Sequence, residues 1–250
     1  MQLLPLDQVN QEPVEPTFRR LGLVAHAVLN KITIRDWRDQ HKVPRTGGVI
    51  FVANHIGNFD VLALGEYLIW SGRWPRFLGK SDIFRLPLLG HLARACGQIP
   101  VERRSVRAKD ALLHAAKALD EGKAVVLYPE GTITGDPDVW PMVARTGAAR
   151  LALQTGYPVV PLGQMGAQLV LGQKRLTWPR LIPKKTMSVI CGDPIDLSAF
   201  RGLDLTKEVL EEVSDLIMDE ITRLVEQIRG QRAPQERYDI RVGRRVPRRR

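Results

Sequence analysis

The stretch GVIFVANHIGNFD, residues 48–60 of a 250-residue chain, decides the fold. Its short apolar run 49–53 predicts a buried strand, and the Gly and Asn that follow predict a turn into a helix. His55 and Asp60 lie five positions apart, which would place them about 140° apart on a continuous helix, so they can meet only if His55 sits in the turn. We therefore expect Asn58 to cap the helix, Asp60 to lie in its first turn, and the imidazole and carboxylate to meet.

Outward from this stretch, apolar runs alternate with helical patterns. The expected strands are 49–53, 75–78, 98–101, 124–127, 158–162 and 187–191. The expected helices are 18–34, 59–70, 105–120, 146–154 and 206–229. This alternation predicts an α/β fold: a single domain over residues 17–230, with a mostly parallel (mixed) sheet flanked by helices. Ligands of such sheets bind beyond the carboxyl ends of the strands, where we expect His55, Arg103 and Glu130.

The two ends of the chain are expected to differ from this domain. Residues 1–16 contain three prolines and predict an irregular lead-in, whereas residues 18–34 predict an N-terminal helix that packs on the domain or lies at a membrane interface. The net charge is +10, of which residues 229–250 carry +7. We expect residues 231–250 to form a disordered basic tail, solvated or drawn to an anionic surface such as a membrane or a nucleic acid.

Composition bounds the location and the chemistry. The chain has no uninterrupted run of about 18 apolar residues, so no transmembrane helix is expected. Its first residues lack a basic region followed by an apolar core, so no secretory signal is expected either. The two cysteines, Cys96 and Cys191, are far apart and have no metal-ligand spacing, which predicts a reducing compartment, no disulfide and no metal site.

Residues 83–92 form an unusually apolar segment for one that contains Pro and Gly. One interpretation is that the segment is buried. The other is that it forms a lipid-contacting patch with nearby aromatic and basic residues: Tyr67, Trp70, Trp74, Arg73, Arg76 and Arg85.

Four short blocks stand in one order along the chain: Asn54-His55-x4-Asp60, Gly97-Gln98-Ile99-Pro100-Val101-Glu102-Arg103, Tyr128-Pro129-Glu130-Gly131-Thr132 and Val159-Val160-Pro161-Leu162. They resemble the N-H-x4-D, G-x-I-x-x-x-R, F-P-E-G-T-R-S and V-x-P boxes of the glycerolipid acyltransferase family typified by 1-acyl-sn-glycerol-3-phosphate acyltransferase. The resemblance covers residues 48–195. It implies an O-acyltransferase that moves a fatty acyl group from acyl-CoA or acyl carrier protein, as co-substrate and without a cofactor, to the free hydroxyl of lysophosphatidic acid. The product would be phosphatidic acid, in phospholipid biosynthesis.

The resemblance also implies a role for each residue that matches the boxes. His55 would take the proton of the acceptor hydroxyl, and Asp60 would hold the imidazole tautomer and stabilise the imidazolium. The hydroxyl attacks the thioester directly, so no Ser or Cys nucleophile is needed. The backbone N–H groups of Gly131 and Thr132 are candidates to stabilise the oxyanion.

The acceptor's phosphate requires cations, and the resemblance assigns this role to Arg103 and Lys80, although each could instead form a surface ion pair. Glu130 is expected to shape its loop and to pair with a cation. Where the family has E-G-T-R-S, this chain has Ile133, so the usual phosphate-binding arginine is absent. Arg145, just before an expected helix start, is a candidate to replace that charge.

We therefore expect a peripheral enzyme at the cytoplasmic face of the cell membrane. Its partners would be a lysophospholipid acceptor, the acyl donor and an anionic membrane surface, and we expect no nucleic acid. Ile133 leaves open the same chemistry on another lysolipid or on a phosphoinositol glycolipid. Two other classes remain: a basic nucleic-acid-binding module, which would explain the tail but not the four blocks, and a lipid thioesterase, which would release CoA without an acceptor.

Overall fold

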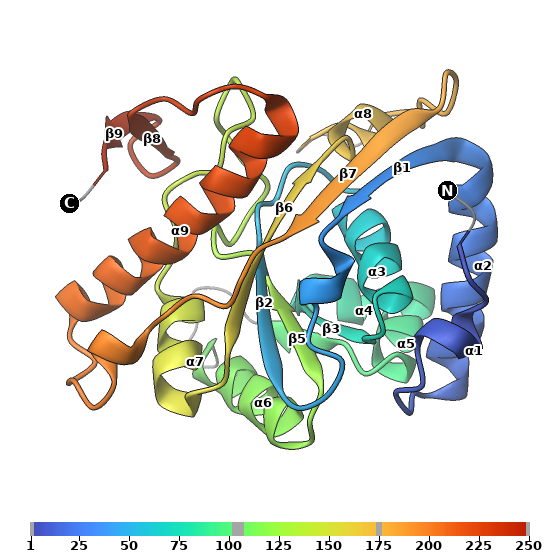
Figure 1. Cartoon of the computed structure of the whole chain (residues 1–250), viewed down its shortest axis with the longest axis horizontal. Coiled ribbons are helices and arrows are strands. Elements are labelled where there is room, and N and C mark those ends of the chain that lie inside the picture. Colours follow the sequence, from blue (N-terminus) through green and yellow to red (C-terminus); the bar gives the residue numbers. More distant parts are fainter. Residues whose placement is uncertain (1–2, 102–107, 174–176, 249–250) are drawn as a thin grey trace.

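A seven-stranded mixed sheet forms the centre of the molecule (Figure 1). The structure is a computed structural model that describes residues 3–101, 108–173 and 177–248. Its strands are β1 (Thr33–Arg38), β2 (Val49–Ala53), β3 (Pro75–Lys80), β4 (Ile99–Val101), β5 (Ala124–Leu127), β6 (Val159–Met165) and β7 (Lys185–Cys191). The strand order is β1-β7-β6-β2-β5-β3-β4, and among these strands every neighbouring pair is parallel except β6 with β7. β2 is therefore central, and its carboxyl end lies at the same edge as those of β3, β5 and β6.

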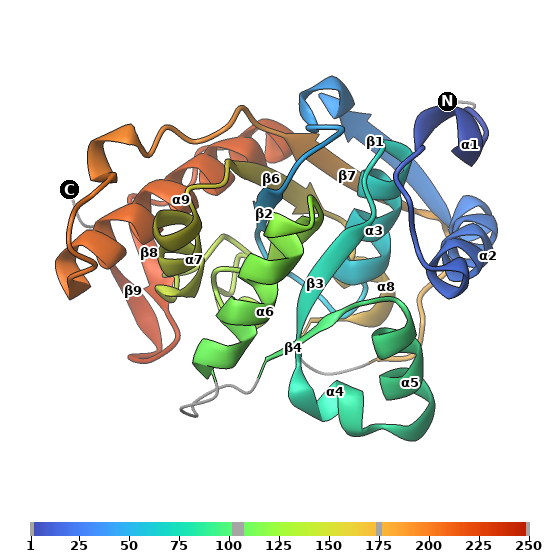
Figure 2. The same cartoon turned by 90° about the horizontal axis from the view of Figure 1, so that it is seen from below.

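Helices cover both faces of this sheet, which gives three layers (Figures 1 and 2). The helices are α1 (Leu6–Val9), α2 (Pro16–Ile32), α3 (Asp60–Trp70), α4 (Ser81–Arg85), α5 (Pro87–Ala95), α6 (Ala108–Asp120), α7 (Gly147–Thr155), α8 (Gln168–Leu171) and α9 (Lys207–Arg229), with short 3-10 turns at Gln40–Lys42 and Ser198–Phe200. α6, α7 and α9 lie on one face, and α2, α3 and α5 lie on the other. The hydrophobic side of α9 closes the first face, as its sequence pattern predicts.

Alternation along β2 divides the core between the two layers. Ile50 and Val52 pack in the cluster that includes α6, α7 and α9, whereas Phe51 packs in the cluster with Leu64 and Leu68 of α3. All five side chains are 0% exposed. Each contributes about 1.5–3 kcal/mol through burial, so the strand that leads to His55 is rigidly held. The predicted α/β fold with a mostly parallel, mixed sheet and an N-terminal helix is confirmed.

The strand β1 was not predicted from the sequence. The helical pattern was expected to continue to Ile34, but α2 ends at Ile32 and the chain becomes extended at Thr33. β1 pairs with β7 alone, as the edge strand of the described sheet, and its polar sequence TIRDWR lacks the continuous apolar run of a central strand. An edge strand needs less burial, which explains why hydrophobicity did not reveal it.

The N-terminal segment is more ordered than the expected irregular lead-in. Within it, α1 forms a helical turn whose Leu6 is buried. Glu12 accepts a hydrogen bond from the Trp74 backbone N–H at 2.6 Å, and Glu15 pairs with Arg76 at 2.7 Å. These carboxylates attach the segment to the domain, which composition alone could not show.

The expectation of a disordered basic tail is wrong for residues 231–248. They contain an antiparallel hairpin of β8 (Glu236–Asp239) and β9 (Arg244–Pro247) that folds back on α9 and the loops below it (Figure 1). Several of its arginines pair with acidic residues distant in the sequence, and Arg237 is only 3% exposed. Carboxylates of α9 and of loop 128–146 form ion pairs with these arginines, so part of the positive charge of this segment is neutralised within the fold.

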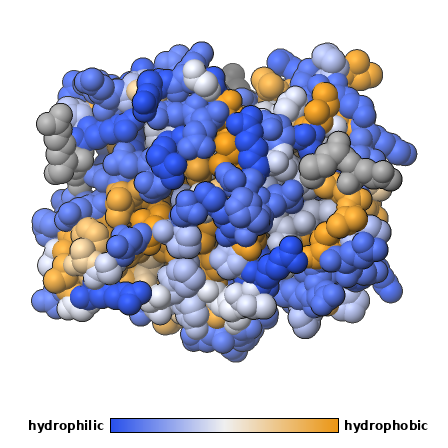
Figure 3. Space-filling view, in the orientation of Figure 1, coloured by the Kyte–Doolittle hydropathy of each residue, from blue (hydrophilic) through white to orange (hydrophobic). Residues whose placement is uncertain are grey.

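The surface carries scattered apolar groups (Figure 3). On the face drawn there, hydrophobic groups lie in patches among hydrophilic ones, including patches along the edge that carries α2. In the segment 83–92, Ile83, Leu86, Leu88 and Leu89 are exposed.

The aromatic and basic residues expected to extend that patch mostly do not. Tyr67, Trp70, Trp74, Arg73 and Arg76 are all buried, because they pack around α3 and the N-terminal segment. Arg85 is exposed. Among the described residues, no helix is both long and apolar enough to cross a membrane.

Candidate active site

The turn between β2 and α3 is fixed by the side chain of Asp60. Its Oδ2 accepts hydrogen bonds from the backbone N–H groups of Ile56 at 2.7 Å and Gly57 at 3.1 Å. The expected cap at Asn58 is not formed: the helix begins after Phe59, and the Asn58 amide donates instead to the Gln173 carbonyl at 2.6 Å. Asp60 thus fixes the turn that precedes the helix, and within the described structure no side chain caps the helix start itself.

The structure brings His55 and Asp60 together as predicted. Nδ1 of His55 lies 2.7 Å from Oδ2 of Asp60, and the side chains are 16% and 0% exposed. Burial raises the pKa of Asp60, although His55 and the two N–H donors act in the opposite direction. When the Nδ1–H of His55 points at the Asp60 carboxylate, Nε2 is free to accept a proton. This is the arrangement of a general base held in place by a carboxylate.

Asn54 joins the turn after β2 to β6. Its amide donates to the Gln164 carbonyl at 2.9 Å and accepts from the Gln164 N–H at 2.9 Å, while the Gln164 side chain donates to the Asn54 carbonyl at 2.7 Å. These side-chain contacts join the two strands just beyond the last ladder pair, Ala53 with Leu162. Gln164 was missed in the sequence because a lone Gln after an apolar strand carries no distinctive signal.

Tyr128 lies directly beside His55. Its ring stacks on the His55 ring with centroids 4.2 Å apart and an angle of 14° between the planes. Burial raises the pKa of Tyr128 well above its ordinary value, although the Gln164 side chain near its hydroxyl acts in the opposite direction. The ring is thus a wall of the site, and the buried hydroxyl makes no well-formed hydrogen bond within the described residues.

Glu130 connects the loop after β5 to the turn that carries His55. One oxygen accepts from the His55 backbone N–H at 2.8 Å and the other from the Met142 N–H at 3.1 Å. Burial raises the pKa of Glu130 to about 8, against the effect of these two donors. Glu130 shapes the loop as expected. The expected pairing with a cation is not found: within the described residues no cation lies at ion-pair distance from Glu130, and its carboxylate binds backbone N–H groups instead.

Gly131 gives Arg145 room to cross the loop. Its φ is +70°, and a Cβ there would lie 2.7 Å from Cδ of Arg145. The Gly131 N–H donates to the Tyr128 carbonyl at 2.9 Å, so in this conformation it is already engaged and not free for an oxyanion. Thr132 is half-buried beside it.

A cavity of about 330 Å³ opens on the other side of Tyr128 and reaches Arg145. Apolar residues such as Leu112 and Leu127 line most of it, and Arg150 of α7 is its second charged residue. Neither arginine has an acidic partner at ion-pair distance in the described part of the chain. The sequence did not single out Arg150, although it is the one cation in the otherwise apolar helix GAARLALQT.

The remaining predicted cations are placed differently. Lys80 is at the end of β3, where its half-exposed side chain pairs with Asp82, and it does not line the cavity. This is the surface ion pair left open as its alternative. Arg103 lies outside the described residues. Ile133, which occupies the position of the family's arginine, is 8% exposed, so that position faces the interior.

The fold and the site define an acyltransferase-type α/β domain, with a His–Asp pair at a strand end and a basic, largely apolar cavity beside it. The chain belongs to the Acyltransferase family, whose model matches residues 35–164. The crystal structure of the 1-acyl-sn-glycerophosphate acyltransferase of Thermotoga maritima has the same fold, with a TM-score of 0.64 and 19% identity over 87% of this chain and 81% of that one.

Two similar proteins are named for different acceptor lipids. The chain is 30% identical to a chloroplastic 1-acyl-sn-glycerol-3-phosphate acyltransferase of Brassica napus, over 49% of this chain and 34% of that protein. It is 29% identical to a lyso-ornithine lipid O-acyltransferase of Pseudomonas aeruginosa, over 46% of this chain and 42% of that protein. The matched segments thus span less than half the length of either relative.

Proposed function

We propose that this protein is an O-acyltransferase that transfers a fatty acyl group from a thioester to the free hydroxyl of lysophosphatidic acid. The observation that carries the proposal is the 2.7 Å contact between His55 and Asp60 at the carboxyl end of β2, next to the cavity that Arg145 and Arg150 line. The membership of the Acyltransferase family and the names of several relatives support it.

The reaction follows from this geometry. The acceptor hydroxyl gives its proton to Nε2 of His55 while its oxygen attacks the thioester carbonyl, and Asp60 stabilises the imidazolium that forms. Collapse of the tetrahedral intermediate breaks the C–S bond, and the proton passes from His55 to the leaving thiolate. The products are the acylated lipid and a free thiol, either CoA or the carrier protein's thiol.

Arg145 and Arg150 are assigned to the anionic group of the acceptor. They lie at one cavity without acidic partners among the described residues, so binding an anion there breaks no ion pair that the structure shows. Arg145 would supply the charge that Ile133 lacks. Arg103, on sequence grounds, is assigned to the same phosphate.

A second acceptor class is favoured by one observation. Ile133 is buried where the family's boxes have an arginine, so the cation at that position of the family pattern is missing from this chain. The same transfer to another lysolipid is therefore the alternative. A lyso-ornithine lipid, named in the Pseudomonas aeruginosa relative, and a phosphoinositol glycolipid are its candidate acceptors.

We further propose that the enzyme works at the surface of an anionic membrane, on its cytoplasmic face. The exposed segment 83–92 supports this, as does the loop before β7, where Trp178 and Ile182 are each 92% exposed. That loop adjoins the catalytic turn through the Asn58–Gln173 contact, and Arg180 and Lys184 flank its apolar residues. Trp beside basic residues is typical of the lipid–water interface.

Release of thiol from palmitoyl-CoA and from palmitoyl carrier protein tests the proposal, with each acceptor added separately. Lysophosphatidic acid should stimulate release and be acylated, and His55→Ala should abolish both. Stimulation by a lyso-ornithine or other lysolipid alone would shift the proposal to the alternative. Release that no acceptor stimulates would overturn the transferase assignment in favour of a thioesterase.

A further inference from the structure

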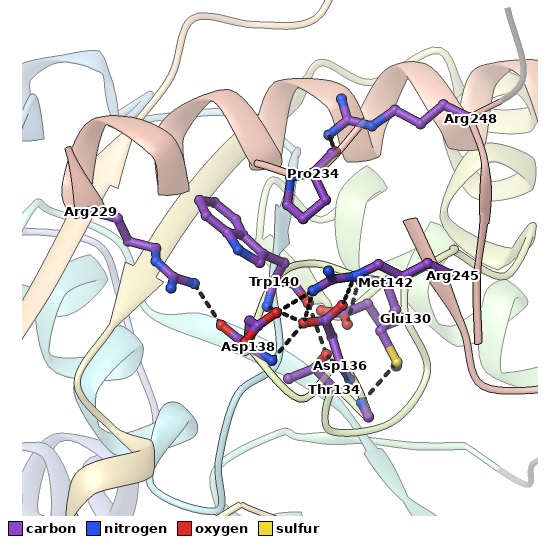
Figure 4. Close-up of polar contacts among 11 residues, drawn as sticks. Glu130, Thr134, Asp136, Asp138, Trp140, Met142, Arg229, Pro234, Arg245 and Arg248 are labelled. Carbon is purple, nitrogen blue, oxygen red and sulfur yellow. Dashed lines mark hydrogen bonds and ion pairs between the residues drawn. The ribbon is translucent and has the colours of Figure 1, made fainter. Parts of the chain in front are cut away.

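The C-terminal hairpin is anchored to α9 by a buried arginine. Arg237 of β8 lies 2.8 Å from Asp219 and 3.4 Å from Asp215, both on α9, and its side chain is 2% exposed. Arg248, just after β9, reaches the same Asp219 at 3.2 Å. It also donates to the Pro234 carbonyl at 2.9 Å (Figure 4). Because both ends of the hairpin are fixed, the strand β9 has a defined position over the loop that follows β5.

From this position Arg245 of β9 points into that loop (Figure 4). Its Nε and Nη2 each lie 2.9 Å from an oxygen of Asp136, and Nη2 lies 2.6 Å from Asp138. Asp136 is only 2% exposed. A paired contact of this kind fixes both distance and orientation, since the planar guanidinium matches the carboxylate. The hairpin makes a second contact through the Tyr238 carbonyl, which accepts from the Val143 N–H at 2.9 Å.

The same loop holds the main chain of the base. Thr134, two residues before Asp136, donates its N–H to the His55 carbonyl at 2.7 Å. The Thr134 hydroxyl donates to the Trp140 carbonyl at 2.9 Å and accepts from the Asp136 N–H at 3.2 Å, so the two residues belong to one bonded turn. At the other end of the loop, Met142 donates to Glu130, which also binds the His55 N–H.

We propose that Arg245 is a positioning residue for the acyl transfer reaction. It touches neither His55 nor the cavity, but it completes a chain of contacts from the hairpin through Asp136 and Thr134 to the His55 carbonyl. The proposal rests on the proposed function, in which His55 is the base. Through Arg245, the hairpin thereby supports the geometry at His55, so this contact is required for turnover and not only for stability.

Arg245→Ala tests this, with Arg244→Ala as the matched control. Arg244 is its exposed neighbour on β9 and has no acidic partner at ion-pair distance in the described residues, so the control removes the same charge from the same strand. We expect Arg245→Ala to lower kcat about 10- to 100-fold, because a displacement of the base by a fraction of an ångström has effects of this size. The KM values for donor and acceptor should stay within about twofold.

Three further measurements separate positioning from general destabilisation. Arg245→Lys keeps the charge but loses the paired contact. Its kcat, measured at a temperature well below every unfolding midpoint, should lie between those of the wild type and Arg245→Ala. Asp136→Asn should lower kcat similarly, and its combination with Arg245→Ala should be far less than additive. The ¹⁵N shifts of the His55 ring should move in Arg245→Ala and stay unchanged in Arg244→Ala.

The outcomes are distinguishable from those that test the function itself. Equal kcat for the Arg245→Ala and Arg244→Ala variants, or an unmoved His55 signal in a folded Arg245→Ala protein, would overturn the positioning role while leaving the transferase assignment intact. If the wild-type protein transferred no acyl group, the function would fail, and the His55 signal would still report whether the hairpin positions that residue.

Discussion

The Tyr128 ring lies flat on the His55 imidazole, with 4.2 Å between centroids, while the buried Tyr128 hydroxyl makes no well-formed hydrogen bond in the described structure. The ring and the hydroxyl should therefore contribute differently. Tyr128→Phe keeps the stacking and removes an unsatisfied group, so turnover should be retained and thermal stability should be unchanged or higher. Tyr128→Ala removes the wall beside the base and should lower kcat at least 10-fold. A large loss in Tyr128→Phe would instead show that the hydroxyl acts in the reaction.

The charge of Asp60 should matter more than its shape. Asp60→Asn retains an oxygen that can accept from the Ile56 and Gly57 N–H groups, but it cannot stabilise an imidazolium at His55. We expect kcat to fall roughly 10²- to 10⁴-fold with little change in KM. Circular dichroism and the unfolding midpoint provide the check that the turn persists. A loss below about tenfold would argue against His55 as the base.

Arg145 and Arg150 should set the affinity for the acceptor. Replacing either with Ala removes a charged hydrogen-bond donor worth about 1.5–3 kcal/mol, so the acceptor KM should rise about 10- to 100-fold while the donor KM changes little. Arg103→Ala is expected from the sequence to act in the same way. Arg232→Ala is the control, because the Arg232 side chain is 94% exposed and pairs with Glu226 on α9. Equal effects on both KM values would place the arginines outside the acceptor site.

Glu130 should make stability depend on pH. Its pKa is raised from 4.5 to about 8 in the folded protein, so between these values the folded state retains a proton that the unfolded state has lost. The contribution of this group to the free energy of unfolding is therefore fully present below pH 4.5 and declines as pH rises towards 8. Denaturant unfolding of Glu130→Gln across this range should show a flatter pH dependence than the wild type. Parallel curves would mean that Glu130 is already ionised well below pH 8.

The loop before β7 should contribute to membrane binding. A Trp178→Ser/Ile182→Ser double variant loses two exposed apolar groups, each worth about 1.5–3 kcal/mol when buried in lipid. It should sediment at least tenfold more weakly with vesicles containing anionic phospholipid, yet retain turnover in detergent. Leu203→Ser, in the turn before α9, removes a half-exposed apolar group elsewhere and serves as the control. Unchanged sedimentation would exclude this loop as a lipid contact.

The sequence predicted the interior of the fold better than its margins. The strands at 49–53 and 124–127 were correct to the residue, because fully buried strands need continuous apolar runs. β1 was missed because an edge strand can be polar. The C-terminal hairpin was missed because its charge suggested disorder, and nothing local reveals that Arg237 pairs with Asp215 and Asp219.

At the site, the meeting of His55 and Asp60 followed from the spacing and the turn residues. The expected cap did not form, since α3 begins after Phe59 and the Asn58 amide donates to the Gln173 carbonyl. Glu130 was identified, but its two backbone donors come from residues 75 positions before it and 12 positions after it, and such partners depend on the folded arrangement. Arg150 could not be identified from the sequence, because its place in the site depends on the position of α7 beside the cavity.

The pairing of β1 with β7 limits the order in which the strands of this chain can pair during folding. Thr33 is opposite Lys185 and Arg38 is opposite Ile190, so the first strand has no partner until about 150 further residues have been synthesised. Among the described strands, β7 alone pairs with β1 and so joins it to the rest of the sheet. During synthesis, the backbone of β1 therefore stays unpaired while β2, β3, β5 and β6 form their part of the sheet. Closure of this edge is a late event in folding, and agents that capture unpaired strands, such as chaperones, have their longest opportunity there.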